Sequence, residues 1–220
     1  MDWSSVVSSL PTLTDGFIYT LKLCLLSATL TLLLGALIAF VLLRNPLKLR
    51  RIVQVYSDIT LSLPLLIVLY VLYFVLPEFD VIWSSPTVGI VALTLYYSPY
   101  VAQVIRSAIR NLPQGQWEAC HSLGMNRRQT LGKVVLPQCV PQMISPLVGL
   151  LIGLIKDSAL LSVISVQEFM YAAKQAISET YAPLEIYLTV AAIYWILNSI
   201  IDWLARRTES RMTRYLNAGA

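Results

Sequence analysis

Five long stretches without a charged side chain constrain this chain more than any other feature. They cover residues 23–43, 59–76, 81–105, 134–155 and 186–201. The hydrocarbon core of a bilayer is roughly 30 Å thick and is crossed by about 20 helical residues. Four stretches reach or approach that length alone, and the last does so if Glu185 and Asp202 lie at the two membrane surfaces. The sequence therefore predicts five membrane-spanning helices, over residues 17–43, 53–76, 85–109, 135–161 and 184–205.

The composition points to the same class of protein. Hydrophobic residues make up 57% of the 220 residues and charged residues only 13%, whereas soluble proteins average about 25% charged residues. Such an excess of apolar surface needs lipid around it, so we predict an all-α integral membrane protein with one transmembrane domain over residues 1–220. The amino terminus lacks a basic region and a small-residue cleavage site, so no removable signal peptide is predicted.

Lysine and arginine gather after the first, third and fifth predicted spans, and loops rich in these residues are usually cytoplasmic. The opposite loops carry mainly acidic residues, with Lys22 and Lys174 as exceptions. This pattern predicts an amino terminus outside and a carboxyl terminus in the cytoplasm, and it accounts for the net charge of +4 without a nucleic-acid partner. The basic residues are Arg44, Lys48, Arg50 and Arg51; Arg106, Arg110, Arg127, Arg128 and Lys133; and Arg206, Arg207, Arg211 and Arg214.

Catalytic and metal chemistry have no support in the sequence. The single histidine, His121, has no second histidine to complete a ligand pair, and Cys24, Cys120 and Cys139 lack the spacing of a metal or redox site. No Gly-x-Ser-x-Gly pattern of an intramembrane hydrolase occurs, nor a Gly-x-x-x-x-Gly-Lys loop for ATP. We therefore predict no catalytic residue, no metal, no disulfide and no cofactor bound by this chain.

A polar, basic island over residues 111–134 separates the third span from the fourth. Residues 114–123 contain no helix breaker other than Gly115, so a short helix is predicted there. Trp117, Cys120 and Leu123 recur every three residues and would share one face of that helix.

A second short helix is predicted directly after the first. Gly124 would end the first helix, because glycine accepts a left-handed backbone without a Cβ clash. Asn126, followed three residues later by Gln129, has the form of a capping box that would open a helix toward Lys133. The two helices and the glycine between them would form a compact knob over residues 114–133.

Residues at fixed spacing in and after this knob resemble the EAA loop of ABC importer permeases. That pattern reads Glu-Ala-Ala, three residues, Gly, nine residues, Ile, any residue and Leu-Pro, and its positions here are Glu118, Ala119, Cys120, Gly124, Val134, Leu136 and Pro137. Cys120 and Val134 depart from the pattern by small or branched apolar exchanges. The resemblance implies a coupling helix that docks in a groove of a separate ATPase through Trp117, Glu118, Ala119, Cys120, Leu123 and Gly124.

Nearly the whole chain resembles a permease subunit of a type I ABC importer of the polar amino-acid uptake branch. The resemblance implies a multi-pass protein of the bacterial cytoplasmic membrane that translocates a polar amino acid or related zwitterion. The implied partners are an extracytoplasmic substrate-binding protein, a second permease subunit that is the same chain or a different one, membrane lipid, and ATPase subunits that hold ATP and Mg. We also hypothesise that Glu118 makes a charge-assisted contact with the ATPase, because it is an acidic side chain among Arg110, Arg127 and Arg128.

Lys156 and Asp157 stand out near the outer end of the fourth predicted span. Charges at membrane depth cost several kcal/mol unless they are paired or hydrated, which makes both residues candidates for function. Adjacent residues on a helix diverge by about 100°, so the two side chains are expected to have different partners. With Ser158 they resemble the Leu-Lys-Asp-Ser/Thr-Ser-Leu segment of amino-acid permeases, and Lys156 would meet a carboxylate and Asp157 an ammonium. The alternative is an interfacial pair that ends the helix.

Two other features are candidate parts of a substrate pathway. The segment from Leu63 to Pro77 resembles the Thr-Pro-Leu-Leu and Leu-Pro pattern of amino-acid permeases, although Leu61-Ser62-Leu63 replaces the usual Arg-Gly-Thr. Pro64 predicts a kink, which would serve either a gate or helix packing. Tyrosines near the middle of the third span would face the pathway or pack between helices. The pathway candidates are Lys156, Asp157, Ser158, Ser62, Tyr97 and Tyr100.

Two smaller predictions concern the end of the chain. Residues 166–181 are moderately apolar and predict a helix on the outer surface, suited to docking by an external protein. Asp202 and Arg206 can pair across one turn of the fifth span.

The alternative function is an ATP-independent secondary transporter. Such proteins usually have two related halves and more spans, and the sequence has no internal repeat.

Overall fold

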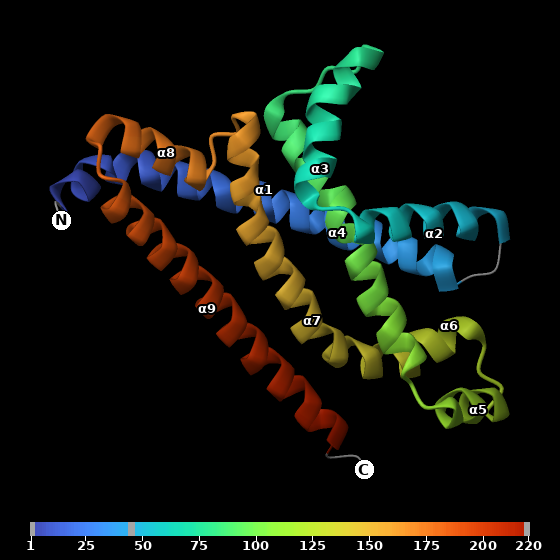
Figure 1. Cartoon of the computed structure of the whole chain (residues 1–220). Coiled ribbons are helices and arrows are strands. Elements are labelled where there is room, and N and C mark those ends of the chain that lie inside the picture. Colours follow the sequence, from blue (N-terminus) through green and yellow to red (C-terminus); the bar gives the residue numbers. More distant parts are fainter. Residues whose placement is uncertain (1–2, 44–46, 218–220) are drawn as a thin grey trace.

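A computed structural model of the chain describes residues 3–43 and 47–217, and every regular element in these ranges is a helix, which confirms the predicted all-α class. Arg44 and the side chain of Arg214 lie outside what is described. Four helical runs are long and apolar enough to cross a membrane (Figure 1). They are α1 (Ser4–Leu43), α4 (Ser85–Arg110), the run Arg127–Ile164 that contains α7 (Leu136–Asp157), and the part Pro183–Met212 of α9 (Pro183–Asn217).

The predicted second span is a broken pair of helices. α2 (Leu47–Ser62) ends before Pro64, and α3 (Leu65–Tyr70) continues after it at a bend of 112°. Pro64 has extended backbone angles and no N–H to donate, so the helix cannot run through it. Residues 53–76 are therefore not one helix, and the kink expected at Pro64 is a full break. Residues 3–43 and 47–217 thus contain four helices long and apolar enough to cross a membrane, or five if this bent pair is counted as one span.

Short turns complete the elements between the long helices. A π-helical turn η1 (Val71–Val75) and a 3-10 turn η2 (Leu76–Phe79) follow α3, and a 3-10 turn η4 (Ser158–Ile164) follows α7. The predicted outer-surface helix over 166–181 is α8 (Phe169–Thr180). Its first turn begins one residue after Glu168, whose side chain caps it.

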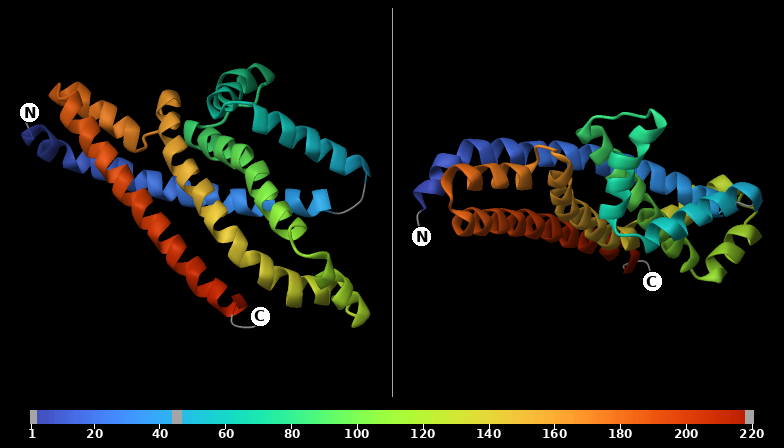
Figure 2. Two further views of the ribbon diagram at one scale, coloured as in Figure 1. Left: turned by 60° about the horizontal axis from the view of Figure 1, so that its bottom comes forward. Right: turned by 45° about the horizontal axis from the view of Figure 1, so that its top comes forward.

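The longest helix, α1, packs directly on α4 and α8 at what we call the glycine seam, formed by Gly16 and Gly35 of α1 against Ala172 of α8 and Val101 of α4 (Figure 2). A Cβ atom on Gly35 would lie 2.6 Å from the Cβ atom of Val101. A Cβ atom on Gly16 would lie 2.5 Å from the Cβ atom of Ala172. Only glycine lets these backbones approach so closely, as small residues do between membrane helices in general.

Contact with α8 also explains why α1 begins at Ser4, well before the predicted start at residue 17. Leu13 packs with Phe169 in a buried cluster. The Thr20 hydroxyl accepts a hydrogen bond of 2.9 Å from the N–H group of Phe169. Tertiary packing thus stabilises a helical segment that its own sequence does not mark as a span.

The main hydrophobic core lies where α1, α3, α4 and α7 meet. Its most buried members are at most 2% exposed and include Leu69, Leu93, Leu154 and Leu161. Tyr97 belongs to the same cluster. The core therefore fixes the end of α7, where Lys156 and Asp157 lie, against the middle of α4.

α9 continues as a helix beyond the predicted range 184–205 and runs beside α7 along one side of the molecule (Figure 2). Its first turns pack on α8 through Ile186 and Phe169. Nearer its end, Arg206 Nε lies 2.9 Å from Asp202 Oδ2, which confirms the predicted pair. Both side chains are largely exposed, so solvent screens the pair and it contributes little to stability.

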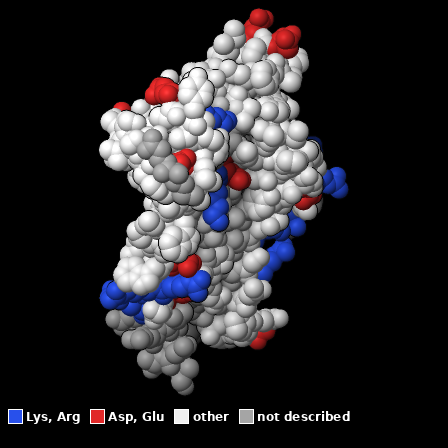
Figure 3. Space-filling model, turned by 60° about the vertical axis from the view of Figure 1, so that its left-hand side comes forward, with Lys and Arg blue, Asp and Glu red and all other residues white. Residues whose placement is uncertain are grey.

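The surface agrees with a lipid environment. Large apolar side chains are exposed along the helices, among them Leu25, Leu33 and Ile200. The face in Figure 3 is mostly uncharged, and its basic and acidic side chains form small groups. Because soluble monomers rarely expose so much contiguous apolar surface, lipid or partner subunits must cover it.

Candidate functional site

The knob between α4 and α7 projects beyond the ends of both helices (Figure 1). Its first helix is α5 (Gln114–Ser122). Gly124 has φ 66°, in the left-handed region that glycine accepts without strain. The N–H groups of Gly124 and Met125 each donate a 3.0 Å bond, to the carbonyls of His121 and Cys120. These two bonds form a Schellman motif, so the end of α5 is satisfied within the knob.

The second helix of the knob opens with the predicted capping box, which is confirmed. The Gln129 N–H donates to Asn126 Oδ1 at 3.0 Å, and the Asn126 N–H donates to Gln129 Oε1 at 2.9 Å. This helix, α6 (Arg127–Thr130), continues through a π-helical turn η3 (Leu131–Val135) into α7. The second half of the predicted loop 111–134 is therefore helical and continuous with the next span.

The side chains of α5 and its C-cap differ in burial. Trp117, Glu118 and Ala119 are exposed, and Leu123 is 78% exposed. Cys120, which was expected on the same face as Trp117 and Leu123, is only 4% exposed. Leu123 is the C-cap of α5, and its N–H group still donates to the Ala119 carbonyl at 3.0 Å, one helical turn back. The three side chains therefore differ in burial, and Cys120 is the one that packs inward.

The knob is tied to both neighbouring helices. The side chain of Gln138 on α7 donates to Gln116 Oε1 on α5 at 3.2 Å. Beneath it, the thiol of Cys139 donates to the Ala108 carbonyl at 3.3 Å. A buried cluster links the last turn of α4 to the first turns of α7 through Ala108, Leu112, Val135, Cys139 and Met143. The knob is therefore joined by direct contacts to both neighbouring helices.

Glu118 has a partner inside the knob. Its Oε1 accepts a 2.9 Å hydrogen bond from the Gln114 side chain, four residues earlier on α5. Its backbone carbonyl accepts a bond from the Ser122 hydroxyl. The carboxylate is exposed and held in one orientation, with acceptor capacity left for an external donor.

Of the six pathway candidates, Tyr97 and Asp157 are brought into direct contact. The Tyr97 hydroxyl donates to Asp157 Oδ2 at 2.8 Å, across the interface of α4 and α7. Tyr96 and Tyr100 pack their rings against Tyr97, with centroids 5.4 and 6.1 Å away. The result is an aromatic cluster at mid-span with one carboxylate at its edge.

Gly153 makes room for this cluster. A Cβ atom at that position would lie 3.0 Å from the Tyr97 hydroxyl oxygen. Gly153 lies one helical turn before Asp157 on α7, so the glycine and the carboxylate face the same tyrosine. The position of Tyr97 thus depends on both residues.

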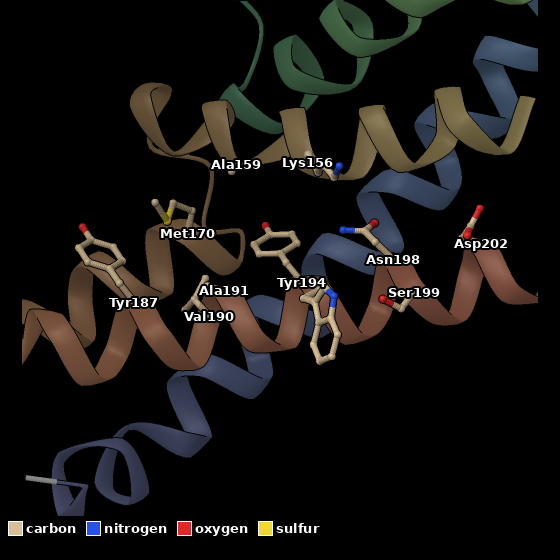
Figure 4. A pocket seen from close by; sticks show the side chains of 11 residues that line it. Lys156, Ala159, Met170, Tyr187, Val190, Ala191, Tyr194, Asn198, Ser199 and Asp202 are labelled. Atoms are coloured by element: carbon tan, nitrogen blue, oxygen red, sulfur yellow. The ribbon is translucent and has the colours of Figure 1, made fainter. Parts of the chain in front are cut away.

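Lys156 points away from Asp157, as the 100° divergence of neighbouring residues predicts. It lines an open groove of about 640 Å³ between α7 and α9, which we call the α7–α9 groove. In Figure 4, Tyr194 and Asn198 project from α9 toward α7, and Lys156 lies opposite. The other lining residues are Ala159, Met170, Tyr187, Val190, Ala191, Trp195, Ser199 and Asp202.

The remaining two pathway candidates have hydroxyls that bond to nearby backbone carbonyls. Ser158 is buried, and its hydroxyl donates to the Ile155 carbonyl at 2.8 Å. Ser62 is exposed at the end of α2, and its hydroxyl donates to the Asp58 carbonyl at 2.8 Å. Both hydroxyls serve their own helices.

Two notable side chains were not predicted as site residues. Asn198 lies on α9 with its Oδ1 atom buried and without a hydrogen-bond partner among the described residues. A polar residue inside the apolar run 186–201 was the available signal. Glu168 is fully buried at the start of α8, where its carboxylate accepts bonds of 2.8 Å from the N–H groups of Met170 and Tyr171. Nothing in its local sequence marks it as buried.

Burial changes the acidity of Glu168. Loss of solvent raises the pKa of its carboxyl to about 7, because the charged form is disfavoured away from water. The two backbone N–H donors and the ammonium of Lys174 act in the opposite direction and do not overcome burial. Within the described residues, no group of three or more His, Cys, Asp and Glu side chains is arranged to hold a metal ion.

The sequence and fold match a known family. Residues 31–214 match the family described as binding-protein-dependent transport system inner membrane component. The match covers most of the chain, so the chain belongs to this family. The predicted resemblance to permease subunits of ABC importers is confirmed.

Particular relatives sharpen this assignment. The chain is 32% identical over 216 residues to the L-cystine transport system permease protein TcyB of Bacillus subtilis, covering 97% of this chain and 92% of that protein. It is 31% identical over 203 residues to the probable glutamine ABC transporter permease protein GlnP of the same species, covering 90% and 93%.

Solved structures give the same result for the fold. A crystal structure of an amino acid ABC transporter with histidines aligns with a TM-score of 0.91 at 32% identity, over 96% of this chain and 99% of that chain. An inward-facing conformation of the MetNI methionine ABC transporter aligns with a TM-score of 0.76 at 22% identity, over 91% and 96%. The second similarity supports the fold alone.

Proposed function

We propose that this chain is the permease subunit of an ATP-driven importer for a polar amino acid or related zwitterion. The relatives at 30% identity or more carry descriptions that name cystine, glutamine or an amino acid as the transported or bound molecule. Apolar spans that surround a tyrosine and carboxylate cluster are consistent with passage of a polar solute. None of these findings favours the ATP-independent secondary transporter.

The exposed, self-capped knob is the observation that carries this proposal. Trp117 and Leu123 offer apolar surface outward, and Glu118 and Ala119 lie beside them. Cys120 is turned inward. In the proposal this surface docks on a separate ATPase that holds ATP and Mg, Glu118 makes a charge-assisted contact there, and the cluster beneath the knob passes the displacement to α4 and α7.

The topology follows from the same proposal. The knob and the carboxyl terminus face the cytoplasm, and α8 and the amino terminus lie outside. An extracytoplasmic substrate-binding protein docks on the α8 side, and a second permease subunit, identical or different, completes the pathway. The basic residues at the knob end of the chain support this orientation.

For the substrate itself we propose two contact regions on either side of α7. Asp157, held by Tyr97 and flanked by Tyr100, suits an ammonium group. Lys156 in the α7–α9 groove suits a carboxylate. Ser62 and Ser158 are not retained in this proposal, because both hydroxyls are engaged within their own helices.

The test is transport by the reconstituted complex with its ATPase and binding protein. Trp117→Ala removes the largest exposed apolar side chain of the knob, so we expect substrate uptake and substrate-stimulated ATP hydrolysis to fall together by about tenfold or more, the cost expected for an anchor residue. Trp83→Ala is the matched control, because Trp83 is similarly exposed just before the other end of α4. Full uptake by Trp117→Ala, or uptake without any ATPase, would refute the proposal.

A further inference from the structure

Three arginines gather where α2 begins and α4 ends. The charge of Arg106 is within electrostatic reach of Arg110 on its own helix and of Arg50 on α2. Among the described residues, Asp58 is the acidic group that acts on Arg106, so these three arginines share one carboxylate. Like charges held this close repel one another, and the arrangement is costly unless an anion lies among them.

The described residues do not supply that anion. No hydrogen bond or ion pair joins Arg50, Arg106 or Arg110 to an acceptor among residues 3–43 and 47–217. The Nε atom of Arg106 is buried without a partner in the same ranges. An unpaired buried N–H group of a charged side chain is costly, which indicates an acceptor from outside the described residues.

The neighbouring surface of α2 is apolar and turned outward. Leu49, Ile52, Val55 and Ile59 recur every three or four residues and are between 49% and 67% exposed. The other side of α2 packs inward, where Val53 and Tyr56 contact the cluster of α1 and α4. The arginine cluster therefore adjoins a stripe that suits hydrocarbon, at the end of α4 that leads into the knob.

We propose that Arg50, Arg106 and Arg110 bind the phosphate group of an anionic phospholipid whose acyl chains lie along the exposed stripe of α2. Guanidinium groups bind phosphate oxygens in paired hydrogen bonds, which would satisfy Arg106. Anionic lipids are concentrated in the cytoplasmic leaflet. The assignment to that leaflet rests on the orientation proposed above, whereas the binding of phosphate does not.

The test measures lipid retained by the assembled transporter in native mass spectrometry. Phosphatidylglycerol and phosphatidylcholine are supplied at equal concentration in detergent. We expect selective retention of phosphatidylglycerol, and a loss of at least about tenfold in the triple variant Arg50→Gln, Arg106→Gln, Arg110→Gln. The single variant Arg110→Gln, at an exposed position that leaves the buried interface intact, should give an intermediate loss. Arg211→Gln, on the exposed end of α9, is the matched control and should retain lipid fully.

Three outcomes would overturn the proposal. The first is equal retention of phosphatidylglycerol by the wild type and both cluster variants. The second is displacement of the lipid by inorganic phosphate at the same concentration, which would assign the site to a soluble anion. The third is loss of the ATPase from the cluster variants with lipid retention unchanged, which would assign the arginines to an acidic protein surface. Because lipid is counted without transport, failure here is distinct from failure of the importer proposal.

Discussion

The glycine seam and the α7–α9 groove join long helices in opposite ways. At the seam, the backbones of α1, α4 and α8 approach so closely that a Cβ atom on Gly35 would overlap Val101. Across the groove, α7 and α9 leave about 640 Å³ between their side chains, and Trp195 is 71% exposed at its edge. The seam is complete within one chain. The groove is open and is lined in part by polar side chains, so another molecule must fill it to complete the packing.

The largest effect is expected from Gly35→Ala, which breaks the seam. The new Cβ would lie 2.6 Å from two atoms of Val101 and 2.9 Å from the Ser98 carbonyl oxygen, so α1 and α4 must move apart. Overpacking a buried interface typically lowers stability by about 1 to 3 kcal/mol. Because Gly35→Ala must displace a backbone, its loss of stability is expected at or above the upper end of that range. The measurement is the apparent melting temperature of the detergent-solubilised chain.

Gly149→Ala on α7 is the control for that change. A Cβ atom there meets nothing within 4 Å, so stability should stay the same or rise by up to about 1 kcal/mol from the better helix propensity. If both variants lost the same stability, close backbone contact would not be what distinguishes the seam.

A smaller effect is expected at the α8 end of the seam, where Glu168 is buried. Its folded-state pKa of about 7 lies above the ordinary value of 4.5, so the folded chain holds the proton more tightly. This contribution to stability is fully present below about pH 4.5 and is lost as pH rises through 7, by on the order of 3 kcal/mol. As pH rises from 4.5 to roughly 8, the melting temperature of the wild type should fall more than that of Glu168→Gln.

Glu179→Gln, on the exposed face of the same helix, is the comparison variant for the pH series. The melting temperature of this variant should change with pH as that of the wild type does, because the side chain of Glu179 lies in solvent in the folded chain. Parallel curves for the wild type and Glu168→Gln would mean that the buried carboxyl titrates normally and that α8 is held by apolar contacts alone.

The smallest effect is expected in the groove. Trp195→Ala removes a large apolar side chain, yet the isolated chain should lose no more than about 0.5 kcal/mol, because that side chain contributes little to its own core. Ile186→Ala on the same helix is fully buried and should cost about 2 to 5 kcal/mol. A loss above about 2 kcal/mol for Trp195→Ala would show that the groove is part of the folded core.

These two regions also mark what the sequence predicts and what it does not. Uncharged runs predict the spans, and Pro64 predicts a disruption of the second one, because both are local properties. The start of α1 at Ser4 depends on α8, more than 100 residues away in the chain. Glu168 has the local sequence of an acidic loop residue and becomes buried only when α8 folds back on α1.

The candidate site divides in the same way. The end of α5 and the start of α6 are predicted by Gly124 and by the pair Asn126 and Gln129, because helix caps depend on only a few neighbouring residues. The angular separation of Lys156 and Asp157 follows from helix geometry. Their partners do not, because Tyr97 is 60 positions from Asp157. Cys120 is an intermediate case, since the helical period placed it correctly on α5 but gave no indication of which side faces inward.

The self-capped ends of the knob have a consequence for the docking that we propose. Ordering one residue of a flexible backbone costs about 1 to 2 kcal/mol in conformational entropy. The Schellman bonds at Gly124 and the capping box at Asn126 hold this segment in its final shape before any partner arrives. In the proposed importer, a partner that docks there loses little free energy to ordering this segment, so more of its binding energy is available to move the helices beyond.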